Sequence, residues 1–133
     1  MRVASVVLGS ADPRALAAFY ERLLGWTLVE NGPARPGFPD NDGWAMLRPP
    51  PGGSGLGGLS FQWEPDYVPP VWPPEQGAQG MMLHLDIAVA DLDAAVAWAV
   101  GSGARLAEYQ PQDDVRVLLD PAGHPFCLFA GTV

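Results

Sequence analysis

Two segments of the chain repeat one pattern of apolar and polar positions. Each begins with a short, mostly apolar stretch that ends in aspartate, at residues 5–12 and 84–91, and each continues into an alanine-rich stretch that ends at glycine. His84 opens the second copy as Ser5 opens the first, 79 residues earlier. Internal repeats define an architecture, because each copy folds as a similar unit. The pattern therefore predicts two modules of one design.

A helix is expected after the aspartate of each copy. Asp12 and Asp91 are good N-caps, because a carboxylate accepts hydrogen bonds from the free amides of a first helical turn. Pro13 suits the first helical position, and Gly25 supplies the end. Apolar residues recur on one face of the first helix, at Leu16, Phe19, Tyr20 and Leu23. A second helix is predicted to end near Gly101 and Gly103.

The apolar stretch before each helix reads as a strand, and its alternation assigns two faces. Residues 6, 8 and 10 of the first copy, like residues 85, 87 and 89 of the second, suit packing under the helix. The alternate residues, 5, 7 and 9 in the first copy and 84, 86 and 88 in the second, point the other way and include His84 and Asp86. The polar side chains of the second copy are therefore expected on the sheet face that the helix leaves open.

Three further extended segments follow each helix. They are residues 26–30, 43–48 and 59–63 in the first copy, and residues 105–109, 115–119 and 126–130 in the second. The order predicts an α+β fold of two βαβββ modules, whose curved mixed sheets carry helices outside and enclose a cavity. We place module one at about 1–64, a linker loop at 65–80 and module two at 81–133, all in a single domain.

Charge and composition narrow the expected partners. Seven basic and fifteen acidic residues give a net charge of −8, which disfavours nucleic acid and anionic membranes. No apolar run approaches the roughly 20 residues that span a bilayer, and the first residues lack the pattern of a signal peptide. Cys127 is the only cysteine, so no internal disulfide forms. These features predict a cytoplasmic protein.

The linker is rich in proline and contains Trp72 between Val71 and Pro73. Proline runs of this kind serve as polyproline ligands for partner proteins. We favour the other interpretation, a rigid loop that closes over a cleft, because long loops on a folded domain often carry function. Trp72 is then a candidate pocket wall, with a place in the core as an equal alternative.

Several motifs resemble those of the vicinal oxygen chelate superfamily of glyoxalases, bleomycin resistance proteins and dioxygenases, in particular its glyoxalase-like subgroup. They are Asp12-Pro13 before a helix with Phe19-Tyr20 and Leu24-Gly25-Trp26, then Phe61-Gln62, His84-Leu85-Asp86, and Asp120-Pro121-Ala122-Gly123-His124. The resemblance covers nearly the whole chain and implies the two-module fold. It does not identify a reaction, because this fold hosts isomerases, dioxygenases, epimerases, thiol transferases and metal-free drug binders.

The resemblance also implies where a metal ion would sit. Metal-using members take one ligand from the first strand and one from the last strand of each module, which here are Ser5, Gln62, His84 and Cys127. Ser5 and Cys127 depart from the usual histidine or glutamate, and none of the four is a carboxylate. Asp86 either supplies that charge or accepts a hydrogen bond from His84.

The expected site follows from these positions. The candidate ligand-binding residues are Ser5, Gln62, Trp72, His84, Asp86 and Cys127. His84 and Gln62 are the candidate metal ligands, for a divalent Zn, Mn, Ni or Fe ion. His124 lies in an Asp-Pro-x-Gly turn, where a structural role is favoured. Cys127 lies among apolar residues, which favours an inert thiol.

The primary hypothesis is a protein that binds a small molecule in the cavity between the modules, without the full family metal site. The alternative is a metal-dependent lyase, isomerase or dioxygenase that acts on a substrate with vicinal oxygens. A third hypothesis is a structural or regulatory dimer without a ligand. The resemblance also implies a homodimer, because two-module members often pair.

Overall fold

A computed structural model describes residues 1–131 of the chain. It divides into two compact units, with the boundary between Tyr67 and Val68. This boundary lies inside the expected linker at 65–80. Each unit contains one helix and one four-stranded sheet. Each unit therefore has the helix and the sheet expected of one module.

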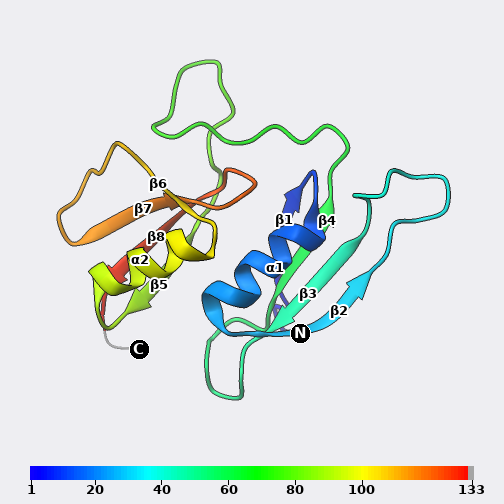
Figure 1. Cartoon of the computed structure of the whole chain (residues 1–133), viewed down its shortest axis with the longest axis horizontal. Helices are drawn as coiled ribbons and strands as arrows, with labels where there is room; N and C mark the ends of the chain where they lie inside the picture. Colours follow the sequence, from blue (N-terminus) through cyan, green and yellow to red (C-terminus); the bar gives the residue numbers. More distant parts are fainter. Residues whose placement is uncertain (132–133) are drawn as a thin grey trace. The chain divides into compact units, whose positions relative to one another are not determined.

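The elements of each unit follow the order strand, helix and three strands (Figure 1). The first unit contains β1 (Val6–Ser10), α1 (Pro13–Leu24), β2 (Thr27–Gly32), β3 (Trp44–Arg48) and β4 (Leu59–Trp63). The second contains β5 (Leu85–Val89), α2 (Leu92–Ser102), β6 (Arg105–Leu106), β7 (Val115–Leu119) and β8 (Pro125–Ala130). The predicted α+β fold of two βαβββ modules is confirmed.

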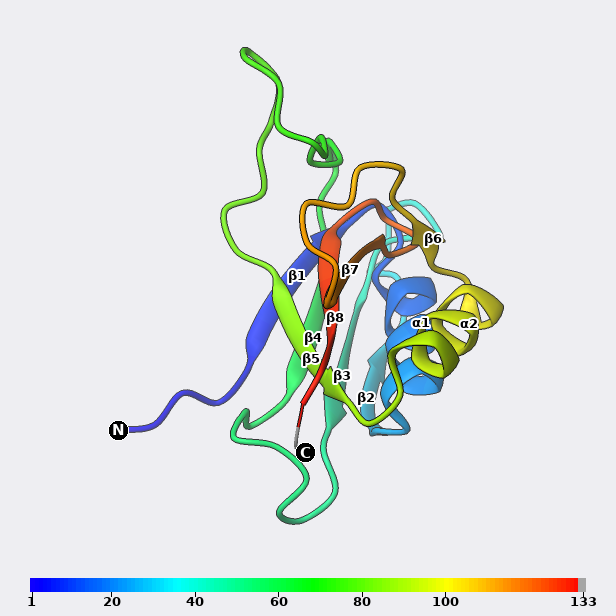
Figure 2. The ribbon, with the colours of Figure 1, turned by 90° about the vertical axis from the view of Figure 1, so that its left-hand side faces the viewer.

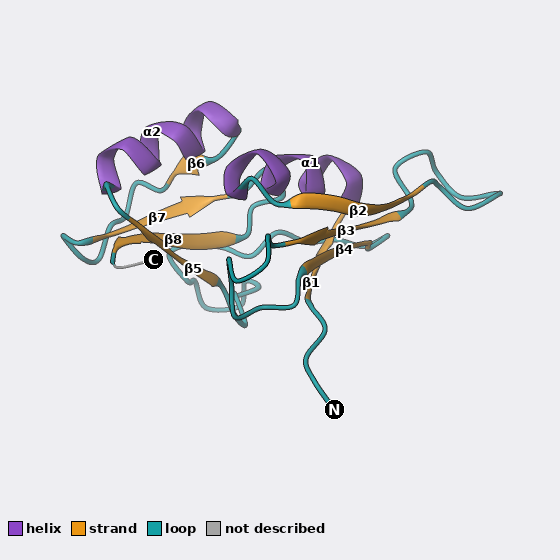
Figure 3. Ribbon diagram, turned by 90° about the horizontal axis from the view of Figure 1, so that it is seen from below, coloured by secondary structure: helices purple, strands orange, loops and turns teal. Residues whose placement is uncertain are grey.

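Both sheets have the same strand order, β1-β4-β3-β2 in the first unit and β5-β8-β7-β6 in the second. The first strand pairs with the last in parallel, and the other neighbours are antiparallel. Helix α1 covers one face of its own sheet, and α2 covers one face of the other (Figures 2 and 3). The opposite face of each sheet carries no helix of its own unit.

The core of the first unit lies between α1 and its sheet. Tyr20 stacks on Phe61 of β4 with ring centroids 5.6 Å apart, and Phe19 meets Tyr20 edge to face. All three side chains are buried. On β1, Leu8 points into this core, whereas Val7 is 51% exposed. The alternation of faces predicted for this strand is therefore correct.

The predicted helix caps are also confirmed. The Asp12 carboxylate accepts from the amide of Ala15 at 3.0 Å, and the Asp91 carboxylate accepts from the amide of Ala94 at 3.0 Å. Helix α1 ends at Gly25, whose φ of 65° lies in the left-handed region that glycine adopts without strain.

One strand is much shorter than predicted. The segment 105–109 pairs only at Arg105 and Leu106. Beyond these residues the side chain of Gln110 replaces a strand neighbour: its amide nitrogen donates to the carbonyls of Ala107 and Val117, and its amide oxygen accepts from Val117 N. The amide of Val117 in β7 is thus satisfied by a side chain, while its carbonyl also accepts from the amide of Ala107, and regular strand pairing ends at Leu106.

The turn before β8 is held by a buried carboxylate. Asp120 accepts hydrogen bonds from the amides of Ala122 and His124, at 2.9 and 3.0 Å, and lies 2.8 Å from His124 Nδ1. This network supports the structural interpretation of His124. Among the residues described, no helix is long and apolar enough to cross a membrane.

The cap of α2 gives a first test of the fold. Replacing Asp91 with alanine removes the acceptor for Ala94 N, and should lower the free energy of unfolding by about 1 kcal/mol. Asp91→Asn keeps an acceptor and should retain most of the stability. Urea unfolding followed by circular dichroism measures both. Equal losses in the two variants would contradict a capping role.

Candidate functional site

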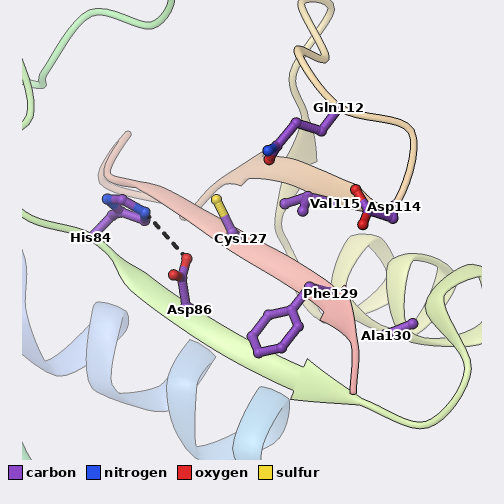
Figure 4. Close-up of a pocket in the computed structure, with 8 residues that line it drawn as sticks. All are labelled: His84, Asp86, Gln112, Asp114, Val115, Cys127, Phe129 and Ala130. Atoms are coloured by element: carbon purple, nitrogen blue, oxygen red, sulfur yellow. Dashed lines mark ion pairs between the residues drawn. The ribbon is translucent and has the colours of Figure 1, made fainter.

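The parallel pairing of β5 with β8 brings the candidate residues of the second unit together. Asp86 lies directly opposite Cys127 in the register. His84 immediately precedes β5 and is two residues from Asp86, so both side chains lie on the same side of the strand. This is the face that α2 does not cover. Figure 4 shows the three side chains on the same side of the two strands.

The polar atoms of these residues are close enough to interact. His84 Nε2 lies 3.2 Å from Asp86 Oδ1, with both side chains partly open to solvent. His84, Asp86 and Cys127 each offer one atom that could bind a metal ion, and these three atoms lie within 4.8 Å of one another. The cluster thus joins an imidazole nitrogen, a carboxylate oxygen and a sulfur in one small volume.

A pocket of about 280 Å³ lies over this cluster. Its lining residues come from β5 and the residue before it, from β7 and the loop before it, and from β8: His84, Asp86, Gln112, Asp114, Val115, Cys127, Phe129 and Ala130 (Figure 4). Polar and apolar side chains both line it. This mixture is typical of small-molecule sites, where a few polar groups orient a ligand against an apolar surface.

The surroundings of Cys127 keep its thiol protonated. Burial raises the pKa of Cys127 to about 11, and the negative charge of Asp86 and a hydrogen bond to that carboxylate act in the same direction. All three causes favour the neutral thiol over the thiolate. At neutral pH, therefore, the cysteine is a hydrogen-bond donor to Asp86 and a poor nucleophile.

The donor set also fits a divalent ion of the zinc type, which binds imidazole, thiolate and carboxylate. Ion binding would require the thiol proton to leave, after which Asp86 and Cys127 would together neutralise a charge of +2. The same atoms can instead bind a ligand hydroxyl or amine, with Asp86 as acceptor. The geometry permits both uses.

In the first unit, the position equivalent to Cys127 is occupied by Ser60. Val7 pairs with Ser60 in β1 and β4, just as Asp86 pairs with Cys127 in the second unit. Ser60 Oγ donates to Ser5 Oγ at 3.0 Å. Sequence reasoning missed Ser60 and named Gln62 instead. The signal that identifies Ser60 is strand register, which the sequence does not contain.

The structure places the two remaining candidates elsewhere. Gln62 lies two residues beyond Ser60, where its amide nitrogen donates to Glu64 Oε1 at 2.5 Å and where it lines a separate pocket of the first unit. Trp72 lies in the long loop between β4 and β5; its indole N–H donates to the carbonyl of Tyr109 at 3.4 Å. Neither lines the pocket around His84.

Comparison with protein families assigns the chain to one group. The sequence model of the family described as "Glyoxalase-like domain" matches residues 5–129, which is almost the entire chain. A comparison with curated proteins gives no match.

Solved structures share the fold. A glyoxalase/bleomycin resistance protein/dioxygenase family enzyme from Burkholderia phytofirmans PsJN is 20% identical, with a TM-score of 0.64 over 96% of this chain and 97% of that chain. A mutant of the fosfomycin resistance protein FosX from Listeria monocytogenes, complexed with Mn(II) and 1S,2S-dihydroxypropylphosphonic acid, is 13% identical, with a TM-score of 0.69 over 99% and 94%. At these identities the likeness shows the fold alone.

The state of Cys127 can be tested by alkylation, because it is the only cysteine. Since its pKa is about 11, the iodoacetamide reaction should be slow at pH 7.5 and accelerate up to about pH 11. Asp86→Asn removes the repulsive charge, so the pKa should fall and the reaction at pH 8.5 should quicken. Asp114→Asn, on the opposite wall, is the control. A rate that levels off below pH 9 would contradict the raised pKa.

Proposed function

The chain belongs to the glyoxalase-like domain family, and from this premise we propose that it binds a small molecule in the pocket formed by His84, Asp86 and Cys127. The observation that carries this proposal is the convergence of three different polar groups in one pocket of the second unit. Val115 and Phe129 supply apolar walls beside them. Such a site orients a ligand through a few hydrogen bonds and holds it by apolar contact.

The side chains of the pocket favour a ligand with hydrogen-bond donors. Asp86 and Asp114 both line the pocket, and the lining contains no lysine or arginine. A hydroxyl or amine can donate to Asp86, while His84 offers a ring nitrogen that donates or accepts according to its tautomer. A ligand rich in phosphate or carboxylate groups would face repulsion from the two aspartates.

We propose that binding proceeds without the full metal site of the family. In the first unit, Ser5 and Ser60 stand at the positions equivalent to His84 and Cys127, and their hydroxyls hydrogen-bond each other. A neutral hydroxyl is a weak ligand for a divalent ion. Gln62, the other candidate, is engaged with Glu64.

We also propose a cytoplasmic location and a homodimer. One cysteine without an internal partner suits a reducing compartment. The dimer is carried over from the pairing of two-module proteins, and analytical ultracentrifugation of the full chain tests it.

A ligand screen tests the binding proposal. Thermal shift against a library of hydroxylated and amine-bearing small molecules should identify a stabilising ligand, whose affinity EDTA leaves unchanged. His84→Ala should weaken that ligand about fivefold to tenfold, the effect of losing one hydrogen bond. Asp93→Ala, at an exposed position of helix α2 outside the pocket, should bind as the wild type does. Affinity that is unaltered by His84→Ala and Asp86→Asn would refute this site.

The second candidate function is a metal-dependent lyase, isomerase or dioxygenase that acts on vicinal oxygens. The cluster of one nitrogen, one oxygen and one sulfur donor specifically favours it, and the related FosX structure contains Mn(II). In this case His84, Asp86 and Cys127 would hold the ion, which would supply Lewis-acid polarisation of a substrate oxygen. The side chains that line the chain's own pocket would orient the substrate.

Metal content separates the two functions. Untagged protein is incubated with Zn²⁺, Mn²⁺, Ni²⁺ or Fe²⁺, dialysed and measured by inductively coupled plasma mass spectrometry. We expect no stoichiometric retention, because the first unit offers only the neutral hydroxyls of Ser5 and Ser60 at the positions equivalent to His84 and Cys127. About one ion per chain, lost in His84→Ala, would instead make the enzyme the primary function and direct assays to vicinal-oxygen substrates.

A further inference from the structure

The loop between β2 and β3 in the first unit is closed by an ion pair. Arg35 donates its backbone amide to Asp42 Oδ2 at 2.8 Å, and its Nη2 lies 2.9 Å from Asp42 Oδ1. Asp42 is only 1% exposed. The guanidinium hydrogen bonds lower the pKa of Asp42 to about 2, so the carboxylate is charged at all ordinary pH values. The two ends of the loop are therefore tied together.

The same loop is fastened to the start of helix α1. The side chain of Asn41 donates to the carbonyl of Ala11 at 2.7 Å, and Arg14 donates to the carbonyl of Asp40. Both contacts join residues that are far apart in sequence. A loop held at its ends and along its length presents its side chains in fixed positions, which lowers the cost of binding a ligand.

Aromatic side chains extend from this loop toward the end of the sheet. The Arg35 guanidinium carbon lies 3.9 Å from the centroid of the Phe38 ring, which occupies one face of the cation. Phe38 meets Trp63 edge to face, with centroids 5.9 Å apart. The chain of contacts leads from the ion pair to an indole at the end of β4.

A second indole, that of Trp44, lies against the backbone of Gly32. A Cβ atom placed on Gly32 would collide with Nε1 and Cδ1 of this ring. A Cβ on Gly43 would lie 2.6 Å from the Gly32 carbonyl oxygen. These two glycines let the indole and the loop approach closely. Trp44 nevertheless remains 43% exposed, so the ring is supported on one side and open on another.

These groups surround a pocket of about 460 Å³, within the range typical of small-molecule sites. Its lining residues all belong to the first unit: Gly32, Pro33, Arg35, Asp42, Gly43, Trp44, Gln62 and Trp63. It is a different pocket from the one around His84. Two indoles give it the character of a stacking surface, because flat rings pack on indole faces.

The polar groups of this pocket define what a flat ligand must carry. Gln62 donates one amide N–H to Glu64, which orients the amide and leaves its oxygen as an acceptor for a ligand. The Nε and Nη2 atoms of Arg35 donate hydrogen bonds to Asp42, and the Nη1 atom can donate to a ligand. Because Asp42 offsets the charge of Arg35 and Glu64 lies beside Gln62, an anionic ligand gains no net attraction.

We propose that the pocket between the β2–β3 loop and Trp44 binds a neutral, flat aromatic molecule of one or two fused rings that carries both an N–H or O–H donor and a carbonyl acceptor. The ring stacks on the open face of Trp44, its donor meets Gln62 Oε1, and its acceptor meets Arg35. This site goes beyond the function proposed above, because none of its residues belongs to the His84 pocket.

The probe for this site is 2-quinolinone, a flat lactam with an adjacent N–H and carbonyl. Decahydro-2-quinolinone has the same hydrogen-bonding groups without a flat ring and serves as the control. The five tryptophan side-chain N–H signals of ¹⁵N-labelled protein report where the probe lies. We expect the signals of Trp44 and Trp63, assigned with phenylalanine variants, to shift with 2-quinolinone while those of Trp72 and Trp98 do not.

Two variants test the stacking surface by isothermal titration calorimetry. Trp44→Leu should weaken 2-quinolinone about tenfold, equivalent to about 1.4 kcal/mol. Gly32→Ala keeps every lining side chain but displaces the indole, and should weaken the probe comparably. Trp98→Leu, which makes the same exchange at an exposed position of α2, should leave the affinity unchanged. Circular dichroism verifies that the variants fold.

Three outcomes would overturn the proposal. They are no binding of 2-quinolinone, equal binding of its saturated analogue, and shifts confined to indoles other than Trp44 and Trp63. The shifts are read on the wild type, so the test stands even if a variant fails to fold. Probe binding that is lost in His84→Ala but kept in Trp44→Leu would place the molecule in the other pocket, and would support that function while refuting this one.

Discussion

In each unit the first strand hydrogen-bonds to the last strand in parallel, β1 to β4 and β5 to β8. Parallel neighbours cannot be joined by a tight turn, so the chain must cross over, and here a helix and two further strands lie within the crossover. The helix occupies one face of the sheet. The register then decides which side chains meet on the other face: Asp86 meets Cys127, and Val7 meets Ser60. Both the site and its counterpart depend on this pairing.

One scaffold therefore carries two different chemistries. The second unit presents a histidine, a carboxylate and a thiol along its paired first and last strands, whereas the first presents two serines that hydrogen-bond each other. The pocket of the first unit lies instead at the end of its sheet, where a tied loop meets Trp44. The strand pairing is the same in both, so the difference comes from a few side chains and from loop length. Fold alone thus does not assign the reaction.

The sequence was sufficient for elements governed by local chemistry. The caps at Asp12 and Asp91 and the alternation on β1 need only neighbouring residues, and His84 and Asp86 share a face because strands have a period of two. Ser60 could not be found in this way. Ser5 and His84 are 79 residues apart, but Ser60 and Cys127 are only 67 apart, because the loops before β4 are longer than those before β8. The Arg35–Asp42 pair was missed because it depends on the path of a loop.

The proton on Cys127 links the two candidate functions of the second unit. A ligand that donates to Asp86 requires no change in this proton, because the carboxylate can accept from the ligand and from the thiol together. A divalent ion needs both oxygen and sulfur as anions, so it must first displace the proton that burial and the Asp86 charge hold in place. The free energy of removing that proton must be offset by contacts between the ion and the three residues of this unit, because the serines of the first unit add no charge. A neutral donor ligand therefore binds with the thiol still protonated, whereas binding of an ion is coupled to release of that proton.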